Sequence, residues 1–254
     1  MSAPSPEPQS EDRSPSKPLL EHLEDLRWVL LKSLSVLLIA CVGCFFFAPK
    51  IIDFLQYPLK KSGVEDPTKV LKALGPMDPF AIAFDAALYA GAIIATPFLV
   101  YIIASYLLPA LTQRERRAIT PVLFLSSFFF LAGVFFCYFF VLPPSLRVAR
   151  EFAAWLHINA DFWTISSYVG FVTKFMLGMG IAFELPLAIL ILLRLGILDY
   201  SMLTKARPYV VVGILILASA LSPGTDVFSM LLMAIPLLVM FEACIWIAWF
   251  KRAE

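Results

Sequence analysis

The feature that most constrains this chain is a series of long apolar runs, at residues 28–48, 79–108, 118–142, 168–194, 208–222 and 227–250. A helix needs about 20 predominantly apolar residues to cross a bilayer, and the first four runs meet that length. Hydrophobic residues make up 60% of the chain and charged residues only 15%. A soluble core of this size could not bury so much apolar surface. The sequence therefore predicts an all-α, six-span integral membrane protein.

The last two runs are interpreted as a helical hairpin. The run 208–222 offers roughly 22 Å of helix, which is short for a crossing, before Ser222-Pro223-Gly224-Thr225-Asp226. The run 227–250 is long enough to cross a bilayer, but it contains Pro236 and Glu242. We therefore expect the sixth span, like the fifth, to be shorter than the other spans. A short span predicts local thinning of the bilayer.

Prolines inside the spans predict kinked helices. Pro97, Pro186 and Pro236 each remove a backbone donor that lipid cannot replace. Kinks favour a curved arrangement over a regular bundle, although ordinary kinking without a role is an equal alternative. Pro143-Pro144 is expected to stop the third span, and residues 145–156 then show the spacing of a short amphipathic helix at the outer interface.

The distribution of charge predicts the domain organisation and the orientation. Residues 1–18 are rich in Pro, Ser and acids and are expected to form a disordered tail without a signal peptide. Residues 19–250 form a single membrane domain, and 251–254 a second tail. Basic residues cluster in the short connections after the second and fourth spans and at the C-terminus, which predicts cytoplasmic termini. They are Arg114, Arg116, Arg117, Arg194, Lys205, Arg207, Lys251 and Arg252. Without a transit peptide, a bacterial inner membrane is favoured over a thylakoid.

Enzyme and nucleic-acid functions find little support. The only histidines are His22 and His157, and the chain lacks a zinc-protease helix motif, a serine nucleophile elbow and a phosphate-binding loop. We therefore predict no catalytic residue, cofactor or metal ligand. A net charge of +1 argues against a nucleic-acid partner. The spacing of Cys41 and Cys44 matches a redox motif, so a membrane oxidoreductase is a remote alternative to simple packing.

Two acidic positions near the first and second spans form a candidate site for a cationic ligand. Glu21, Glu24 and Asp25 share one face of an amphipathic helix that precedes the first span. Glu115 stands among arginines in the first cytoplasmic connection. A solvated helix face and internal pairing with those arginines are the simpler alternatives. If the carboxylates are close together, they suit guanidinium groups, which bind carboxylates through paired hydrogen bonds.

Glu184 lies near the middle of the fourth span. An ionisable group at this depth is costly and is a functional hypothesis by default. It could contact a polar group of another helix, form a hydrogen bond that fixes the fold, or be the proton site of a proton-coupled small-solute carrier. Many carriers show internal repeats, which this sequence lacks.

Several ordered segments together resemble the TatC family, the multi-spanning receptors of twin-arginine translocation, from about residue 19 to 250. They are His22-Leu23-Glu24-Asp25-Leu26-Arg27, Pro58-Leu59, Pro109-Ala110-Leu111, Glu115-Arg116-Arg117, Phe183-Glu184-Leu185-Pro186, Arg207-Pro208-Tyr209, Leu221-Ser222-Pro223 through Asp226, Ala234-Ile235-Pro236-Leu237 and Phe241-Glu242. Each segment is weak alone, but their shared order within six spans is specific.

The resemblance implies a concave, glove-like fold and Sec-independent export of folded proteins, driven by the proton-motive force. It implies that Asp25 and Glu115, with Glu24 and Arg27 beside them, bind twin-arginine signal peptides. It also implies an oligomeric complex in the bilayer with TatA-type and TatB-type single-span proteins.

The same resemblance assigns contacts with partner helices and assembly to Glu184, Pro58, Asp226, Phe183, Pro186 and Met230. Four positions depart from the family pattern. Asp25 replaces a common Glu and shortens the acid, and Tyr106 replaces a common Phe and adds a hydroxyl. Met230 replaces a common Gln and loses a polar contact, and Asp85 stands where a base or no charge is common, so no role is carried onto it.

Overall fold

The six predicted spans are present in the fold. The structure, a computed structural model, describes residues 19–107, 113–157, 162–194, 196–221 and 227–252. In this part of the chain six helical segments are long and apolar enough to cross a membrane. They are Glu24–Phe46, Asp78–Tyr106, Leu123–Trp155, Ile165–Leu193, Tyr200–Ala220 and Val227–Phe250. The protein is therefore an all-α, six-span membrane protein.

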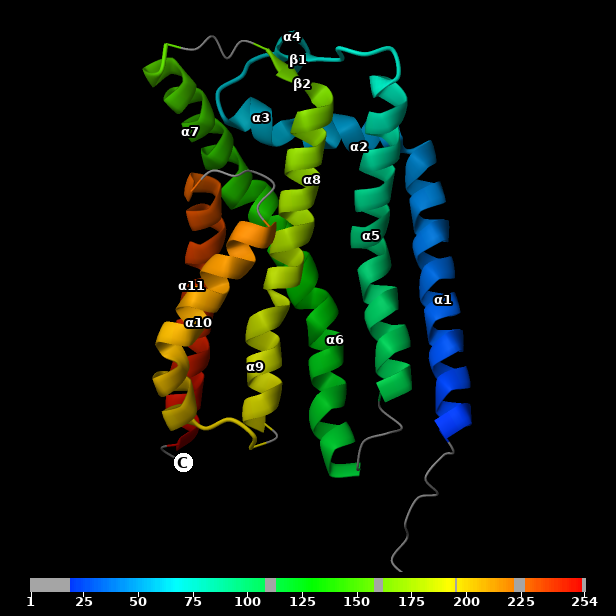
Figure 1. The fold of residues 1–254 in the computed structure, drawn as a ribbon, viewed down its shortest axis with the longest axis vertical. Helices are drawn as coiled ribbons and strands as arrows, with labels where there is room; N and C mark the ends of the chain where they lie inside the picture. The colour runs from blue at the N-terminus through cyan, green and yellow to red at the C-terminus, as the bar shows by residue number, and fades with distance from the viewer. Residues whose placement is uncertain (1–18, 108–112, 158–161, 195, 222–226, 253–254) are drawn as a thin grey trace, which may run out of the picture.

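The spans form an open series and not a closed bundle. Helix α1 (Leu19–Phe46) packs on α5 (Asp78–Leu107), which in turn contacts α6 (Gln113–Phe136) and α8 (Ile165–Ala182). Helix α9 (Glu184–Arg194) contacts α11 (Val227–Arg252), and α11 packs on α10 (Tyr200–Leu221). In Figure 1, α1 and the hairpin α10–α11 lie on opposite sides of the molecule. Only 6% of the α1 span is buried, so most of its surface is left for lipid or partners.

The two ends of the molecule differ. Helix α1 begins and α11 ends at the same end, which we call the termini end (Figure 1). At the opposite, capped end, α2 (Ala48–Leu55) and α3 (Tyr57–Lys61) lie across the spans, next to α4 (Pro67–Val70). The strands β1 (Leu71–Lys72) and β2 (Trp163–Thr164) pair in parallel there, with Leu71 opposite Trp163. The sequence did not predict this strand pair, which joins the two loops of the capped end.

Two tyrosine hydroxyl groups hydrogen-bond to backbone carbonyls at the junction between α2 and α3. The carbonyl of Phe54 would normally accept from the amide four residues later, but that residue is Pro58, which has no N–H. The Tyr138 hydroxyl donates to this carbonyl instead, at 2.7 Å. The Tyr168 hydroxyl donates to the Leu55 carbonyl at 2.6 Å. Because Pro58 and both tyrosines are buried, the junction is fixed to the spans.

The expected stop at Pro143-Pro144 is wrong. Helix α6 continues through a π-helical turn, η2 (Cys137–Val141), directly into α7 (Leu142–Trp155). Both prolines lie in the first turn of α7, where an amide needs no intrahelical acceptor, so they are tolerated. The short helix expected over 145–156 is present as α7, but it prolongs the third span without a break. Beyond its end, His157 adopts a positive φ of 55°, a conformation typical of helix C-termini.

The fifth span is the shortest of the six described spans, as expected, but it is long enough to cross a bilayer. Helix α10 begins at Tyr200, eight residues before the apolar run, and has 22 residues, or roughly 33 Å. Helix α11 has 26 residues. The apolar run underestimates α10 because Lys205 and Arg207 lie within its first two turns. Local thinning of the bilayer stays a prediction.

Candidate functional site

Glu184 lies at a break between two helices. Helix α8 ends at Ala182 and α9 begins at Glu184, with Phe183 between them. Pro186 causes this break, because it cannot donate to the carbonyl four residues earlier, that of Ala182. The amide of Phe183 still donates to the Met179 carbonyl at 3.0 Å. The chain therefore stays nearly helical, and Glu184 enters the first turn of α9 (Figure 1).

The carboxylate of Glu184 is only partly satisfied. The Ser126 hydroxyl, on α6, donates to its Oε2 at 2.7 Å. The other oxygen, Oε1, is buried and has no hydrogen-bond partner among the described residues. A buried polar atom without a partner is costly, and a serine cannot neutralise a charge. The site therefore keeps one unused hydrogen-bond acceptor in the described part of the chain.

Close packing of α6 against α8 and α9 holds this site. Ser126, Phe130 and Gly133 recur at i, i+4 and i+7 and share one face of α6. A Cβ on Gly133 would lie 2.8 Å from Cγ of Phe183 and 2.9 Å from the Met179 carbonyl oxygen. A Cβ on Gly180 would lie 2.8 Å from Phe130. The absence of side chains at both glycines brings Ser126 and Glu184 within hydrogen-bond distance.

The predicted assembly residues do not form one cluster. Phe183, Glu184 and Pro186 are adjacent, and the Cys244 thiol donates to the Pro186 carbonyl at 3.6 Å, which joins the site to α11. Pro58 lies instead in α3, at the capped end, and Met230 is half-buried in the first turn of α11. Asp226 lies outside the described residues.

The predicted signal-peptide site lies at the termini end. Glu24, Asp25 and Arg27 lie near the start of α1, where Glu24 and Arg27 are exposed and Asp25 is half-buried. Glu115 lies in the first turn of α6, but its side chain is outside the described residues. Both helices begin at this end, and α5 contacts both. The contact between the two carboxylates stays a prediction.

The sequence analysis missed an ion pair between the arms of the last hairpin. Arg207 Nη2 on α10 lies 2.8 Å from Glu242 Oε2 on α11. A signal for it was available. Arg207 precedes the end of α10 by 14 residues (221 − 207), and Glu242 follows the start of α11 by 15 (242 − 227). Opposite charges at equal distances from a turn lie at equal depth in a hairpin.

The comparisons with known proteins agree with this fold. The sequence model of the family Sec-independent protein translocase protein (TatC) matches residues 21–236. This chain belongs to the TatC family. The TatC protein of Aquifex aeolicus is 34% identical over 230 residues, which cover 91% of this chain and 94% of that protein. The TatC protein of Akkermansia muciniphila is 36% identical over 186 residues, 73% of this chain but only 53% of the relative.

A solved structure supports membership at the level of the fold. The crystal structure of a twin-arginine translocase receptor, TatC, superposes with a TM-score of 0.76 at 33% identity, covering 90% of this chain and 98% of that one. The resemblance predicted from the short segments is confirmed. The carrier alternative for Glu184 finds no support, because the relatives named here are protein translocase components.

Proposed function

We propose that this TatC-family chain is the signal-peptide receptor and assembly scaffold of a twin-arginine translocase, which exports folded proteins independently of the Sec pathway. The observation that carries the proposal is the match to a twin-arginine translocase receptor over 90% of the chain. The chain lies in the cell's inner membrane with both termini in the cytoplasm. It binds and positions other proteins and performs no enzymatic step, and the proton-motive force drives transport.

Recognition of the signal peptide takes place at the termini end. The two guanidinium groups of the peptide bind Asp25 and Glu115 through paired, charge-assisted hydrogen bonds. Glu24 adds negative charge beside them. Arg27, three residues after Glu24, shares its helix face and limits the net negative charge. The acidic start of α1 supports this role. An anionic membrane surface favours basic segments, so carboxylates at this end of the molecule are better explained by a cationic ligand.

A peptide-binding experiment tests this recognition. A photo-crosslinkable peptide with two arginines is compared with the same peptide carrying two lysines, on membranes containing the full chain. Lysine cannot form the paired hydrogen bonds, so the lysine peptide should crosslink less. Asp25→Asn and Glu115→Gln should each weaken binding of the arginine peptide by roughly ten- to a hundredfold, since a hydrogen bond to a charged group contributes about 1.5–3 kcal/mol.

The matched control is Asp53→Asn, which removes an exposed carboxylate from α2 at the capped end. It should leave crosslinking unchanged. Equal crosslinking of both peptides, or equal loss in the control, would show that these carboxylates do not recognise the arginines.

Assembly with single-span partners uses the spans themselves. TatA-type and TatB-type helices pack beside α9, and a polar group from one of them satisfies Oε1 of Glu184. The unpartnered oxygen supports this role. Phe183 and Pro186 shape the break that presents Glu184, whereas Pro58, Met230 and Asp226 contribute to assembly from the capped end or from α11 and its preceding connection. The result is an oligomeric complex.

A further inference from the structure

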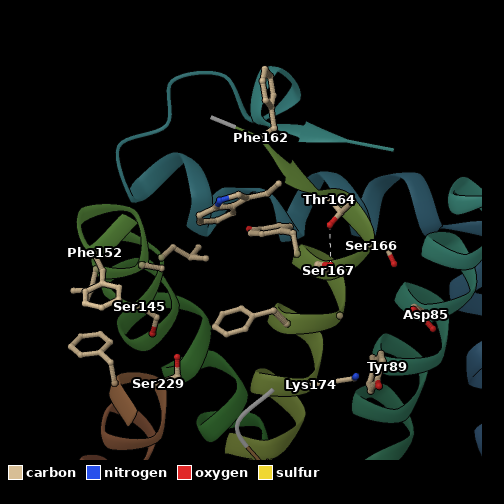
Figure 2. Close-up of a pocket in the computed structure, with 18 of the residues that line it drawn as sticks. Asp85, Tyr89, Ser145, Phe152, Phe162, Thr164, Ser166, Ser167, Lys174 and Ser229 are labelled. Atoms are coloured by element: carbon tan, nitrogen blue, oxygen red, sulfur yellow. Dashed lines mark hydrogen bonds between the residues drawn. The ribbon is translucent and has the colours of Figure 1, made fainter. Parts of the chain in front are cut away.

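A large cavity opens between α5, α7, α8 and the start of α11, in the half of the molecule nearer the capped end (Figure 2). Its volume is about 1270 Å³, above the range of about 300–1,000 Å³ typical of small-molecule sites. Much of its lining is apolar, with Leu146, Phe152, Phe171 and Phe228 among the lining residues. The cavity is distinct from the Glu184 site and from the acidic start of α1.

Two opposite charges line this cavity. Asp85 projects from α5 and Lys174 from α8 (Figure 2), and Tyr89 of α5 also lines the cavity. Within the described part of the chain, neither charge has a hydrogen bond or an ion pair. Charged groups inside a membrane span are costly unless they are paired or hydrated. Both are therefore available to a ligand that brings one negative and one positive group.

Both charges lie near the depth of lipid headgroups. Helix α5 has 30 residues, so it is roughly 45 Å long and extends about 7 Å, or five residues, beyond each face of a 30 Å hydrocarbon layer. Asp85, seven residues after the start of α5, lies close to that boundary. Lys174 is nine residues into α8. From this depth a lysine side chain reaches the headgroup region by snorkelling.

Hydroxyl groups line the same cavity. Thr164, Ser166 and Ser167 come from the connection into α8 and its first turn. The Thr164 hydroxyl donates to the Ser167 hydroxyl at 2.9 Å (Figure 2). A serine hydroxyl can donate one hydrogen bond, so Ser166 and Ser167 are suited to the oxygens of a phosphate.

We propose that this cavity binds one phospholipid with a phosphoethanolamine headgroup, taken from the leaflet at the capped end. The phosphate pairs with Lys174 and the serine hydroxyls, the ammonium donates to Asp85, and the acyl chains lie along the apolar walls. Asp85 disfavours a purely anionic headgroup, and a choline headgroup has no N–H to donate. A partner helix would have to place both charges inside the membrane, which is costly. The phosphoethanolamine headgroup contains both charges and already lies at this depth.

A headgroup series on the unmodified full chain tests the proposal without any variant. The purified protein in detergent is titrated with phosphatidylethanolamine, its mono- and dimethyl derivatives, phosphatidylcholine and phosphatidylglycerol, and bound lipid is counted by native mass spectrometry. We expect phosphatidylethanolamine to bind most tightly, with affinity falling at each methylation to about fivefold weaker for choline. Equal binding of all five lipids, or no bound lipid, would overturn the proposal.

Charge variants locate the site. Asp85→Asn should abolish the preference for ethanolamine over choline, and Lys174→Gln should weaken all phospholipids by about two- to fivefold. The matched controls Asp53→Asn and Lys60→Gln change exposed charges of α2 and α3 that do not line the cavity, and they should retain the full preference. A preference that persists in both cavity variants, or is lost in the controls, would place the lipid elsewhere and reject this site.

Discussion

Glu184 and Glu242 are two carboxylates inside spans that are satisfied in different ways. Glu242 is 47% exposed and lies 2.8 Å from the guanidinium of Arg207, on the neighbouring arm of its hairpin. Glu184 is half-buried at the centre of the fold, where it receives one hydrogen bond from a neutral serine and keeps one buried oxygen without a partner in the described chain.

Glu242 is therefore a structural carboxylate, whereas Glu184 is available to a partner. Arg207 neutralises Glu242 within the chain, so this pair joins α10 to α11 and offers little to an incoming helix. No cation approaches Glu184 among the described ion pairs, so its binding capacity stays incomplete. Local composition does not reveal this contrast, since both residues are isolated acids in apolar runs; only the position of Arg207 at a similar depth in the hairpin indicates a partner for Glu242.

The largest expected effect comes from removing each carboxylate in turn. Glu184→Ala should reduce copurification of the single-span partners by roughly ten- to a hundredfold, because a hydrogen bond to a charged group is lost. Glu242→Ala should reduce it by less than about fivefold, since a half-exposed pair contributes little. Quantitative copurification from membranes, with the partners at fixed expression, measures both.

Two further readouts decide whether Glu184 acts through assembly. The loss of the Ser126 hydrogen bond and the removal of a buried oxygen without a partner act in opposite directions, so thermal stability should change little, and signal-peptide crosslinking should fall less than assembly. Glu184→Gln preserves the shape and should restore part of the assembly. Unchanged copurification in Glu184→Ala, or loss of folding in that variant alone, would count against the contrast.

The second prediction sharpens the comparison by moving Glu184 without replacing it. Gly133→Ala places a methyl group within 2.9 Å of Phe183 and the Met179 carbonyl, so Phe183 must shift and the bond from Ser126 to Glu184 should lengthen. Overpacking of this kind costs about 1–3 kcal/mol. Both the unfolding midpoint and partner copurification should fall.

Gly213→Ala is the matched control in the other region. Gly213 lies on α10, in the hairpin that holds Glu242, and a Cβ there would meet nothing within 4 Å. An alanine in a helix is favoured over glycine by roughly 0.5–1 kcal/mol, so this variant should be neutral or more stable. An equal loss of stability and copurification in both variants would mean that replacing any helical glycine by alanine has this effect.

Much of the fold could be predicted because lipid imposes simple rules. A run of about 20 apolar residues must become a helix, and all six runs did. The errors arose where local rules depend on context. Pro143-Pro144 breaks a helix interior but is tolerated in a first turn, which the π-helical turn before it creates. Helix α10 begins at Tyr200, ahead of its apolar run, because helical turns near the membrane boundary can contain charged residues.

The candidate site was predictable only in part. The position of Glu184 in mid-span indicated a functional residue, and Pro186 two residues later predicted a kink. Its donor could not be found, because Ser126 is 58 residues away and depends on the approach of α6 at Gly133. The tyrosine bonds to the Phe54 and Leu55 carbonyls are tertiary contacts of the same kind. Periodicity describes one helix at a time and cannot show which helices meet.

The smallest expected effect tests whether Arg207 and Glu242 act as a pair. A double-mutant cycle with Arg207→Gln and Glu242→Gln should give a coupling energy of about 0.2–1 kcal/mol in unfolding, because both side chains are nearly half exposed. The reversed pair, Arg207→Glu with Glu242→Arg, should recover part of the stability lost in either single reversal. Since Glu184 lies outside this pair, partner copurification should stay near the unmodified level throughout the cycle. A coupling energy of zero would make Glu242 an unpaired acid like Glu184, and the distinction between a structural and an available carboxylate would then have to rest on burial alone.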